Sequence, residues 1–161
     1  ELDLPSLPEQ AWLAFLDEWC SGLTSLDELK ARPLSSIISG RLTYDQMTKL
    51  DKEAPEKFLV PSGSNIKLFY EIDKPPVLAA RIQELFGMKE TPNIAQGRVA
   101  LLIHLLAPNF RVQQITTDLA SFWKNTYAQV RKDLKARYPK HSWPEDPLVA
   151  QAMRGAKRNV T

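Results

Sequence analysis

The stretch from Thr117 to Pro147 constrains the fold more than any other part of this chain. Apolar residues recur through most of it at spacings of three and four, which places them on one stripe of a helix. The stripe consists of Leu119, Phe122, Trp123, Tyr127, Val130, Leu134 and Tyr138. Thr117 and Asp118 can each cap exposed backbone N–H groups at the start. Because Pro139 cannot continue a helix, the pattern predicts a helix of about twenty residues and roughly 30 Å.

A proline-rich run, residues 139–147, follows this helix and contains three prolines and Trp143. Proline fixes the backbone, and a Trp side chain favours burial. The run is therefore predicted to be a rigid strap that folds back onto the helix. Arg137 falls on the apolar side of the helix, where a charge needs a partner. Glu145 and Asp146 are predicted to supply that partner.

The opposite side of the predicted helix is basic when residues are plotted at about 100° per residue. Its members are Lys124, Arg131, Lys132 and Lys135. Residues 121–161 carry 9 Lys/Arg and 3 Asp/Glu, whereas residues 1–120 carry 12 and 16. Such asymmetry favours an acidic partner for the last third of the chain. A merely solvated lysine face is the commoner meaning of a charge run, so both interpretations stay open.

Residues 1–54 have the signals of short helices. Ser25 and Glu28, and again Thr43 and Gln46, stand at the capping-box spacing, in which two side chains satisfy helix-start N–H groups. The chain changes character at Pro55, where residues typical of helices give way to β-branched and aromatic ones.

Residues 57–60 and 66–72 are predicted to form a hairpin, because turn residues separate them. The segment from Pro75 to Phe86 has apolar residues at helical spacing and Gly87 at the usual cap position, which predicts a helix. Residues 99–107 are nearly all apolar and fit a strand covered on both faces. Residues 111–116 are its expected partner strand.

The fold class predicted from these elements is α+β. An N-terminal helical segment precedes a small, mainly antiparallel sheet of about four strands packed against a long amphipathic helix. The expected organisation is a helical segment over 1–54, an α+β domain over 55–147, and a basic tail or short helix over 148–161.

The sequence offers no site for catalysis. It has no Walker-type glycine loop, no Cys/His metal spacing and no nucleophile elbow. His104 lies in an apolar strand, as a hydrogen-bonded core residue would, while His141 is open to a structural role or a phosphate contact. The lone Cys20 fits a reducing compartment, and no apolar run could span a bilayer. A cytoplasmic binding or structural module is expected.

Several short motifs follow one another in a fixed order. They are Pro61-Ser62-Gly63-Ser64, Pro75-Pro76-Val77-Leu78-Ala79, Gln83-Glu84-Leu85-Phe86-Gly87, Glu90-Thr91-Pro92, Gly97-Arg98-Val99, His104-Leu105-Leu106, Thr117-Asp118-Leu119-Ala120-Ser121-Phe122-Trp123, Arg137-Tyr138-Pro139-Lys140-His141 and Trp143-Pro144-Glu145-Asp146-Pro147. In order and spacing they resemble the C-terminal domain of bacterial ATP-dependent helicases of the HrpB type, over about residues 55–147 and more loosely over 9–54. Ala107 and Val112 depart from the family's usual Ser and Pro.

The resemblance implies a piece of a DEAH/RHA-type RNA helicase, which couples ATP hydrolysis to movement along RNA. None of that family's ATP-binding or DEAH-box motifs matches this sequence, so no catalytic residue carries over. ATP and Mg²⁺ are expected in the parent helicase and no cofactor or metal in this piece. Expected partners are RNA or single-stranded nucleic acid, bound without sequence specificity, and the helicase core of the same chain. No membrane is expected.

Two functional interpretations remain. In the first, the module assists nucleic-acid binding through its basic helix face and the basic residues that follow it. The predicted contacts are Lys124, Arg131, Lys132, Lys135, Lys140, His141, Arg154, Lys157 and Arg158. In the second, it is a protein-interaction or packing module that docks on the helicase core or on another protein.

Overall fold

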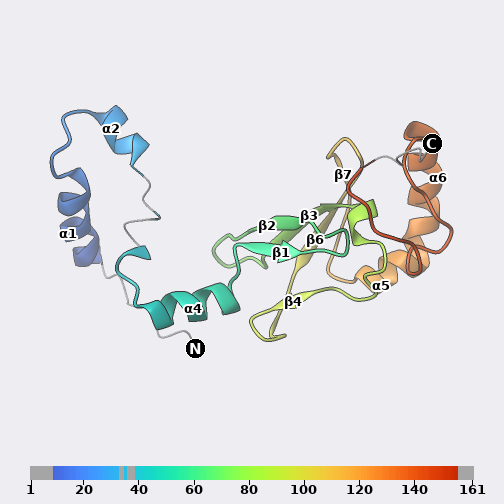
Figure 1. Ribbon diagram of the computed structural model, residues 1–161, viewed down its shortest axis with the longest axis horizontal. Helices are drawn as coiled ribbons and strands as arrows, with labels where there is room; N and C mark the ends of the chain where they lie inside the picture. The colour runs from blue at the N-terminus through green and yellow to red at the C-terminus, as the bar shows by residue number, and fades with distance from the viewer. Residues whose placement is uncertain (1–8, 33–34, 36–38, 156–161) are drawn as a thin grey trace. The chain divides into compact units, whose positions relative to one another are not determined.

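The computed structural model describes residues 9–32, 35 and 39–155 of the chain (Figure 1). The chain forms two compact units, Glu1–Lys52 and Glu53–Thr161. None of the helices in the described residues is both long enough and apolar enough to cross a membrane.

Short helices make up most of the described part of the first unit, as the sequence predicts. They are α1 (Glu9–Cys20), α2 (Leu26–Ala31) and α4 (Tyr44–Glu53), of which α4 ends in the second unit. Ser25 Oγ accepts a hydrogen bond from the Glu28 backbone N–H at 3.2 Å. Thr43 and Gln46 form a complete capping box: Thr43 N donates to Gln46 Oε1 at 2.9 Å, and Gln46 N donates to Thr43 Oγ1 at 3.2 Å. The capping residues thus begin the helices where their spacing places them.

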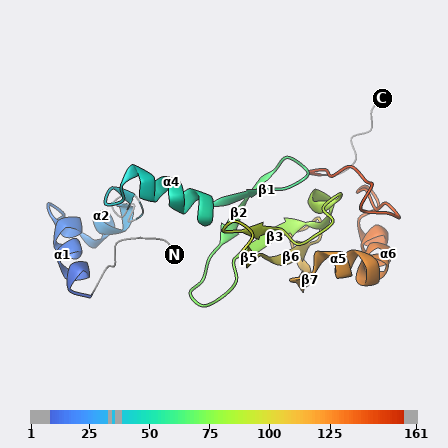
Figure 2. The same ribbon diagram turned by 90° about the horizontal axis from the view of Figure 1, so that it is seen from below.

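The second unit is built on a five-stranded sheet in the order β1-β2-β3-β6-β7 (Figures 1 and 2). The strands are β1 (Lys57–Leu59), β2 (Asn65–Phe69), β3 (Val77–Arg81), β6 (Leu102–Leu106) and β7 (Val112–Thr116). Only β3 and β6 pair in parallel, and the other neighbours are antiparallel. A separate pair joins β4 (Asn93–Ile94) to β5 (Val99–Ala100). The α+β class and the mainly antiparallel sheet are confirmed, with one strand more than expected.

The extra strand lies where the sequence predicts a helix. The helix expected from Pro75 to Phe86 is wrong: β3 occupies Val77–Arg81, and the 3₁₀ turn η1 follows over Ile82–Leu85. Leu78 and Ala80 are both buried, which is the alternation of a strand. As the central strand, β3 pairs with a neighbour on each edge, and this long-range pairing outweighs the local helical spacing.

One face of the sheet belongs to the hydrophobic core. The paired residues Leu68, Leu78 and Ile103 lie side by side on this face and are at most 2% exposed. They share one core with residues of the β3–β6 connection and of the long helix. That core also contains Val60, Ala80, Ile82, Leu85, Phe86, Ile94, Leu101, Leu105, Ala107, Leu119, Phe122, Trp123, Tyr127, Leu134 and Trp143.

The predicted long helix is present but not uniform. It begins as α5 (Leu119–Ser121), widens into a π-helical segment, η2 (Phe122–Thr126), and continues as α6 (Tyr127–Arg137). Both views show α6 beyond one end of the strands (Figures 1 and 2). Asp118 caps its start, accepting a hydrogen bond from Ser121 N at 2.8 Å.

The short helix considered for the residues after Pro147 is absent from the described part of that segment, which runs to residue 155. Its backbone bonds to the η1 region instead of to itself. Gly87 N donates to Pro147 O at 2.9 Å, and Met153 N donates to Gln83 O at 3.0 Å. These bonds satisfy the backbone groups that a helix would have paired internally.

Candidate nucleic-acid interface

The π-helical segment fixes the start of the basic helix. A π turn accommodates one more residue than an α turn, and here it lets three nearby aromatic side chains, Phe122, Trp123 and Tyr127, all face the core. Their ring centroids lie 5.0–6.2 Å apart. Trp123 Nε1 donates a hydrogen bond to Met88 O at 2.8 Å. The helix is therefore anchored by buried rings.

The strap after Pro139 folds back onto this helix, as predicted. Trp143 is 6% exposed, and its Nε1 donates to Tyr138 O at 2.9 Å. The Tyr127 hydroxyl donates to Pro144 O at 2.9 Å. Burial raises the pKa of the Tyr127 phenol far above its ordinary value, so the hydroxyl remains a donor even in alkaline solution. Hydrogen bonds and the buried Trp143 thus join the strap to the helix.

Arg131, and not Arg137, is the charge that the strap neutralises. Arg131 Nε donates to Trp143 O at 3.0 Å, and its Nη2 lies 3.0 Å from Glu145 Oε1. Its side chain is only 23% exposed, whereas Arg137 is exposed. The predicted pairing of Arg137 with Glu145 or Asp146 is thus wrong. The extra residue of the π turn rotates the following helix by about 100° relative to an unbroken α-helix.

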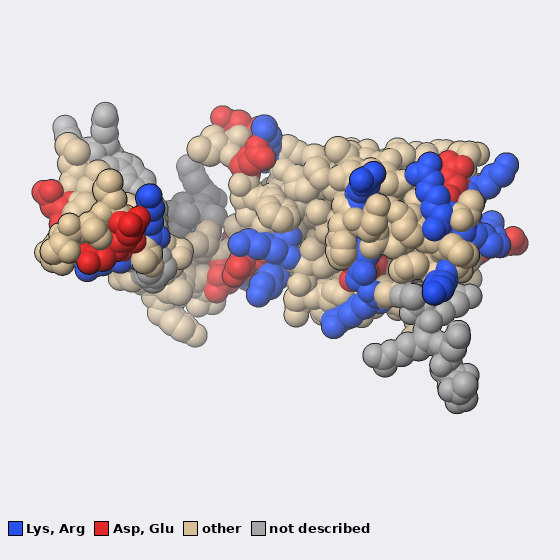
Figure 3. Space-filling model, turned by 90° about the horizontal axis from the view of Figure 1, so that it is seen from above, with Lys and Arg blue, Asp and Glu red and all other residues tan. Residues whose placement is uncertain are grey.

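Four of the predicted contact lysines point to solvent. They are Lys124, Lys132, Lys135 and Lys140. None of them makes a hydrogen bond or ion pair with another residue in the described part of the chain. Figure 3 shows Lys and Arg side chains standing apart on one face, with acidic side chains beside some of them. The four lysines are therefore available to bind anions.

The remaining predicted contacts differ in character. His141 is half-buried, and burial together with the nearby Arg81 charge lowers its pKa below the ordinary value. It is therefore mostly neutral at physiological pH. Arg154 is exposed and donates a hydrogen bond to Gly63 O. Lys157 and Arg158 lie outside the described residues.

A pocket of about 450 Å³ adjoins the π segment. Lys89 and Lys124 line it together with Trp123, and so do the carboxylate residues Glu145 and Asp146. Glu145 is already paired with Arg131, while Asp146 Oδ1 accepts a hydrogen bond from a backbone N–H. The pocket therefore presents charges of both signs.

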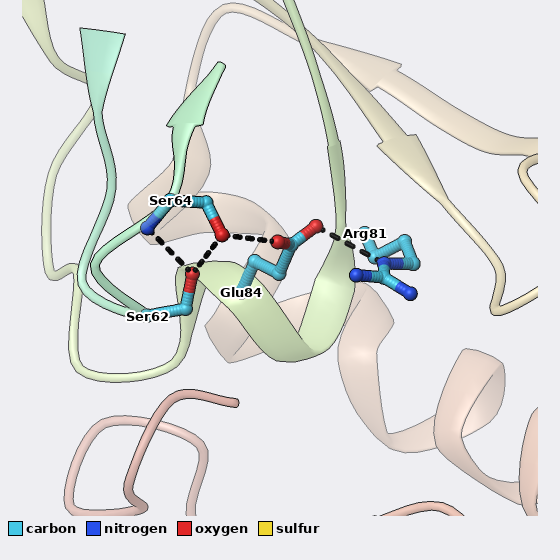
Figure 4. A network of polar contacts seen from close by, with 4 residues as sticks. All are labelled: Ser62, Ser64, Arg81 and Glu84. Atoms are coloured by element: carbon cyan, nitrogen blue, oxygen red, sulfur yellow. Dashed lines mark hydrogen bonds and ion pairs between the residues drawn. The ribbon is translucent and has the colours of Figure 1, made fainter. Parts of the chain in front are cut away.

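The structure also shows a buried polar network that sequence reasoning missed (Figure 4). Glu84 is 6% exposed and accepts hydrogen bonds from Ser64 Oγ at 2.7 Å and from Arg81 Nε at 3.1 Å. Ser62 Oγ bonds to Ser64 Oγ at 2.9 Å. The Arg81 guanidinium also lies over the Phe110 ring, 5.1 Å from its centroid.

The network ties the β1–β2 turn to η1 and pairs a buried carboxylate, as burial requires. The hint in the sequence is the arginine three residues before Glu84. No histidine takes part in the network, so it resembles a structural clamp more than a nucleophilic relay. Elsewhere, the described residues contain no group of three or more His, Cys, Asp or Glu placed to hold a metal ion.

The sheet and the helix held by its strap can be compared with those of known proteins. The chain belongs to the HrpB_C family, described as "ATP-dependent helicase C-terminal", whose profile matches residues 12–147. It is 43% identical over 162 aligned residues to the ATP-dependent RNA helicase HrpB of Escherichia coli (strain K12), covering 98% of this chain and 20% of that protein. The chain thus spans about a fifth of the length of this relative.

Solved structures agree with this assignment. A crystal structure of the E. coli DExH-box NTPase HrpB matches with a TM-score of 0.81 and 43% identity, over 94% of this chain and 19% of that one. A crystal structure of the E. coli DEAH/RHA helicase HrpB matches with a TM-score of 0.66 over 88% of this chain and 18% of that one. The resemblance predicted from the motifs is confirmed.

Proposed function

We propose that this chain is a non-catalytic accessory domain of a cytoplasmic DEAH/RHA-type RNA helicase and assists the binding of RNA or single-stranded nucleic acid. ATP and Mg²⁺ would bind elsewhere in the longer helicase chain, where the hydrolytic motifs lie. The domain would hold nucleic acid beside the helicase core while that core moves along it. Family membership supports the helicase assignment.

The observation that carries the nucleic-acid part is the set of exposed lysines on an anchored helix. Lys124, Lys132 and Lys135 are free of hydrogen bonds and ion pairs among the described residues. The aromatic anchor and the strap hold the helix that carries them, so the lysines need little backbone ordering on binding. Lys140 at the start of the strap extends the set.

Such lysines would contact phosphates, which position a strand without reading its sequence. Binding is then weak, indifferent to sequence and sensitive to salt. For single strands the logarithm of the affinity falls by about 0.7 per log unit of salt for each phosphate neutralised. We do not assign this role to Arg131, because its guanidinium already bonds to the Trp143 carbonyl and to Glu145 of the strap. His141, mostly neutral, would act at most as a hydrogen-bond partner.

The test is a fluorescence-anisotropy titration of a labelled single-stranded RNA at several salt concentrations. Changing Lys124, Lys132 and Lys135 together to Glu should weaken binding and reduce the salt slope by about 2. The matched control changes the exposed Lys30, Lys52 and Lys74 to Glu, which alters net charge equally. Equal loss in both triple variants would mean that net charge alone attracts the RNA. Unchanged binding in the helix variant would reject the proposal.

Absence of ATP chemistry in the isolated chain is a second test. Without a phosphate-cradling loop, it should neither bind nor hydrolyse ATP. Phosphate release that needs Mg²⁺ and follows the purified chain through chromatography would contradict this. The competing function, docking on other protein surfaces, is favoured by a different face of the molecule.

A further inference from the structure

The sheet has a second face, and the strand register defines its residues. Because side chains alternate along a strand, the neighbours of the buried Leu68, Leu78 and Ile103 point the other way. One row across this face is formed by the paired residues Phe69, Val77 and Leu102. The next row is Ala79, His104 and Ile115. We call this surface, with Leu59 and Val112 at its margins, the open face.

The open face is mainly apolar at its centre and partly exposed to solvent. Phe69 is 54% exposed and Ile115 is 52% exposed. At the margins, Leu59 is 63% and Val112 49% exposed. The central residues of the two rows are half-buried. Apolar side chains therefore lie in contact with solvent across all five strands.

A solvated sheet face normally alternates apolar and polar residues. Here the centre of the open face is mostly apolar, with His104 the exception, and polar or charged residues such as Asn65, Lys67 and Arg81 stand toward its edges. Residues 99–107 carry a near-continuous apolar pattern, which is typical of strands covered on both sides. The structure supplies the covering layer for one face only. Contiguous exposed apolar surface of this kind marks an interaction site. The sequence of β6 is thus suited to a second packed layer on the open face of the sheet.

The charges around the open face indicate what would cover it. The five strands, all within the described residues, contain no Asp or Glu. The cations Lys57 and Lys67 stand directly opposite each other on the pair β1–β2, a placement that costs stability unless an anion lies nearby. One glutamate oxygen, from Glu56, lies 3.9 Å from Lys67 Nζ. A complementary surface is therefore apolar in its centre and carries carboxylates at its edge.

Aliphatic side chains make up most of the centre, which favours a protein surface over stacked bases. The E. coli relative is about five times as long as this chain, so in such a protein most of the polypeptide lies outside the part described. A covering surface on the same polypeptide would be present at high effective concentration. A separate partner would need much greater intrinsic affinity to stay bound.

We propose that the open face docks against another part of the same longer helicase chain, through a surface with an apolar centre and a carboxylate edge. The inference rests on the proposed membership in a longer helicase and is independent of the lysines. Failure of the RNA test leaves it intact, because the open face and the lysine set share no residue.

The experiment measures the reactivity of single cysteines with a maleimide, in this chain and in the full-length helicase that contains it. All variants carry Cys20→Ser. Ile115→Cys and Phe69→Cys probe the open face, and Ala128→Cys on the exposed side of α6 is the matched control. Docking should slow labelling of the two sheet cysteines by about tenfold or more in the full-length protein, because reaction then requires transient undocking. The control rate should be nearly equal in the two proteins.

The other outcomes overturn the proposal. Equal sheet-cysteine rates in both proteins would show that the face stays open. Protection that appears only on adding single-stranded RNA would assign the face to nucleic acid. Protection in the isolated chain that grows with its concentration would assign the face to a second copy.

A second variant guards against a folding artefact. Ile115→Asp adds a charge at an exposed position and should leave the melting temperature of the isolated chain nearly unchanged. In the full-length helicase the same change should release the domain, seen as faster proteolytic cleavage around it. Ala128→Asp should do neither. Cleavage that is as slow in the Ile115→Asp helicase as in the unchanged helicase would reject the docking surface.

Discussion

The two faces of the five-stranded sheet have similar apolar residues and opposite surroundings. Ile103 on the inward face is 0% exposed, while Ile115 on the adjacent strand and the open face is 52% exposed. The inward face is covered by the helix and by the β3–β6 connection, which the chain itself provides. Hydrophobicity alone therefore does not distinguish a core from a docking surface. The difference lies in what the rest of the chain brings to each face.

The largest effect should come from removing the aromatic anchor of the core. Trp123→Ala should lower the free energy of unfolding by about 3–5 kcal/mol, as deletion of a large buried aromatic side chain does. The loss includes the hydrogen bond to Met88 O. Urea unfolding followed by circular dichroism measures it. A loss below about 1 kcal/mol would show that the inward face does not depend on this helix.

The two isoleucines provide the direct comparison. Ile103→Ala should cost about 2–5 kcal/mol, because it leaves a cavity in a packed core. Ile115→Ala, at an exposed position, should change the stability of the isolated chain by about 0.5 kcal/mol or less. Both are measured by the same urea titration. Equal losses would remove the distinction between a covered face and an open one.

The two arginines extend the comparison to the helix. Arg131→Ala should cost about 1–3 kcal/mol, since it leaves the Trp143 carbonyl without its donor and releases the strap. Arg137→Ala removes an exposed charge and should have almost no effect. Thermal unfolding of both variants tests this. A larger loss at Arg137 would mean that the strap is held from the other side of the helix.

The smallest effect concerns pH. Burial and the Arg81 charge lower the pKa of His141 in the folded state, so the unfolded chain binds more protons around pH 6.5 than the folded chain does. Stability should then rise with pH in that range, and it should fall as pH drops through the unfolded pKa of about 6.5. His141→Asn should remove this dependence, and Lys140→Gln should not. Unfolding titrations at several pH values measure the slope.

Local signals in the sequence were sufficient for several elements. The hairpin followed from turn residues between β-branched runs, and the end of the long helix followed from Pro139. The strap followed from its prolines and Trp143. In each of these elements, the residues that determine the structure lie within a few positions of one another in the sequence. The class α+β and the family resemblance followed as well.

Two features that local sequence patterns do not reveal explain the wrong predictions: the pairing of strands distant in sequence and the change of helical phase at the π-helical segment. The sequence around β3 predicts a helix because Leu78, Ile82 and Leu85 fit helical spacing, and nothing nearby in the sequence indicates the parallel pairing of β3 with β6. The roles of Arg131 and Arg137 differ from the prediction because a single 100° period does not hold across the π-helical segment η2. The helix after that turn has its own stripe, in which Arg131 stands four residues after Tyr127 and three before Leu134. That spacing was the available signal.

The candidate site was only partly accessible from sequence. Basic residue types and helical period located Lys124, Lys132 and Lys135, which the structure places on the surface. They could not show that Arg131 is engaged, because its partner carbonyl belongs to a residue twelve positions later. The sequence does not predict the open face either, since the exposure of a strand depends on which layers of the fold cover it.

The contacts that close the second unit join positions far apart in the order of synthesis. Arg154 bonds to Gly63 O, and Trp143 completes a core that begins at Val60. At about 5–20 residues per second, a ribosome needs roughly 2–8 seconds to proceed from Thr116, the end of β7, to Arg154. During that interval the strands exist without their last core residues, and both sheet faces are accessible to chaperones or to other nascent chains. The nascent domain is thus most prone to aggregation just before its strap emerges.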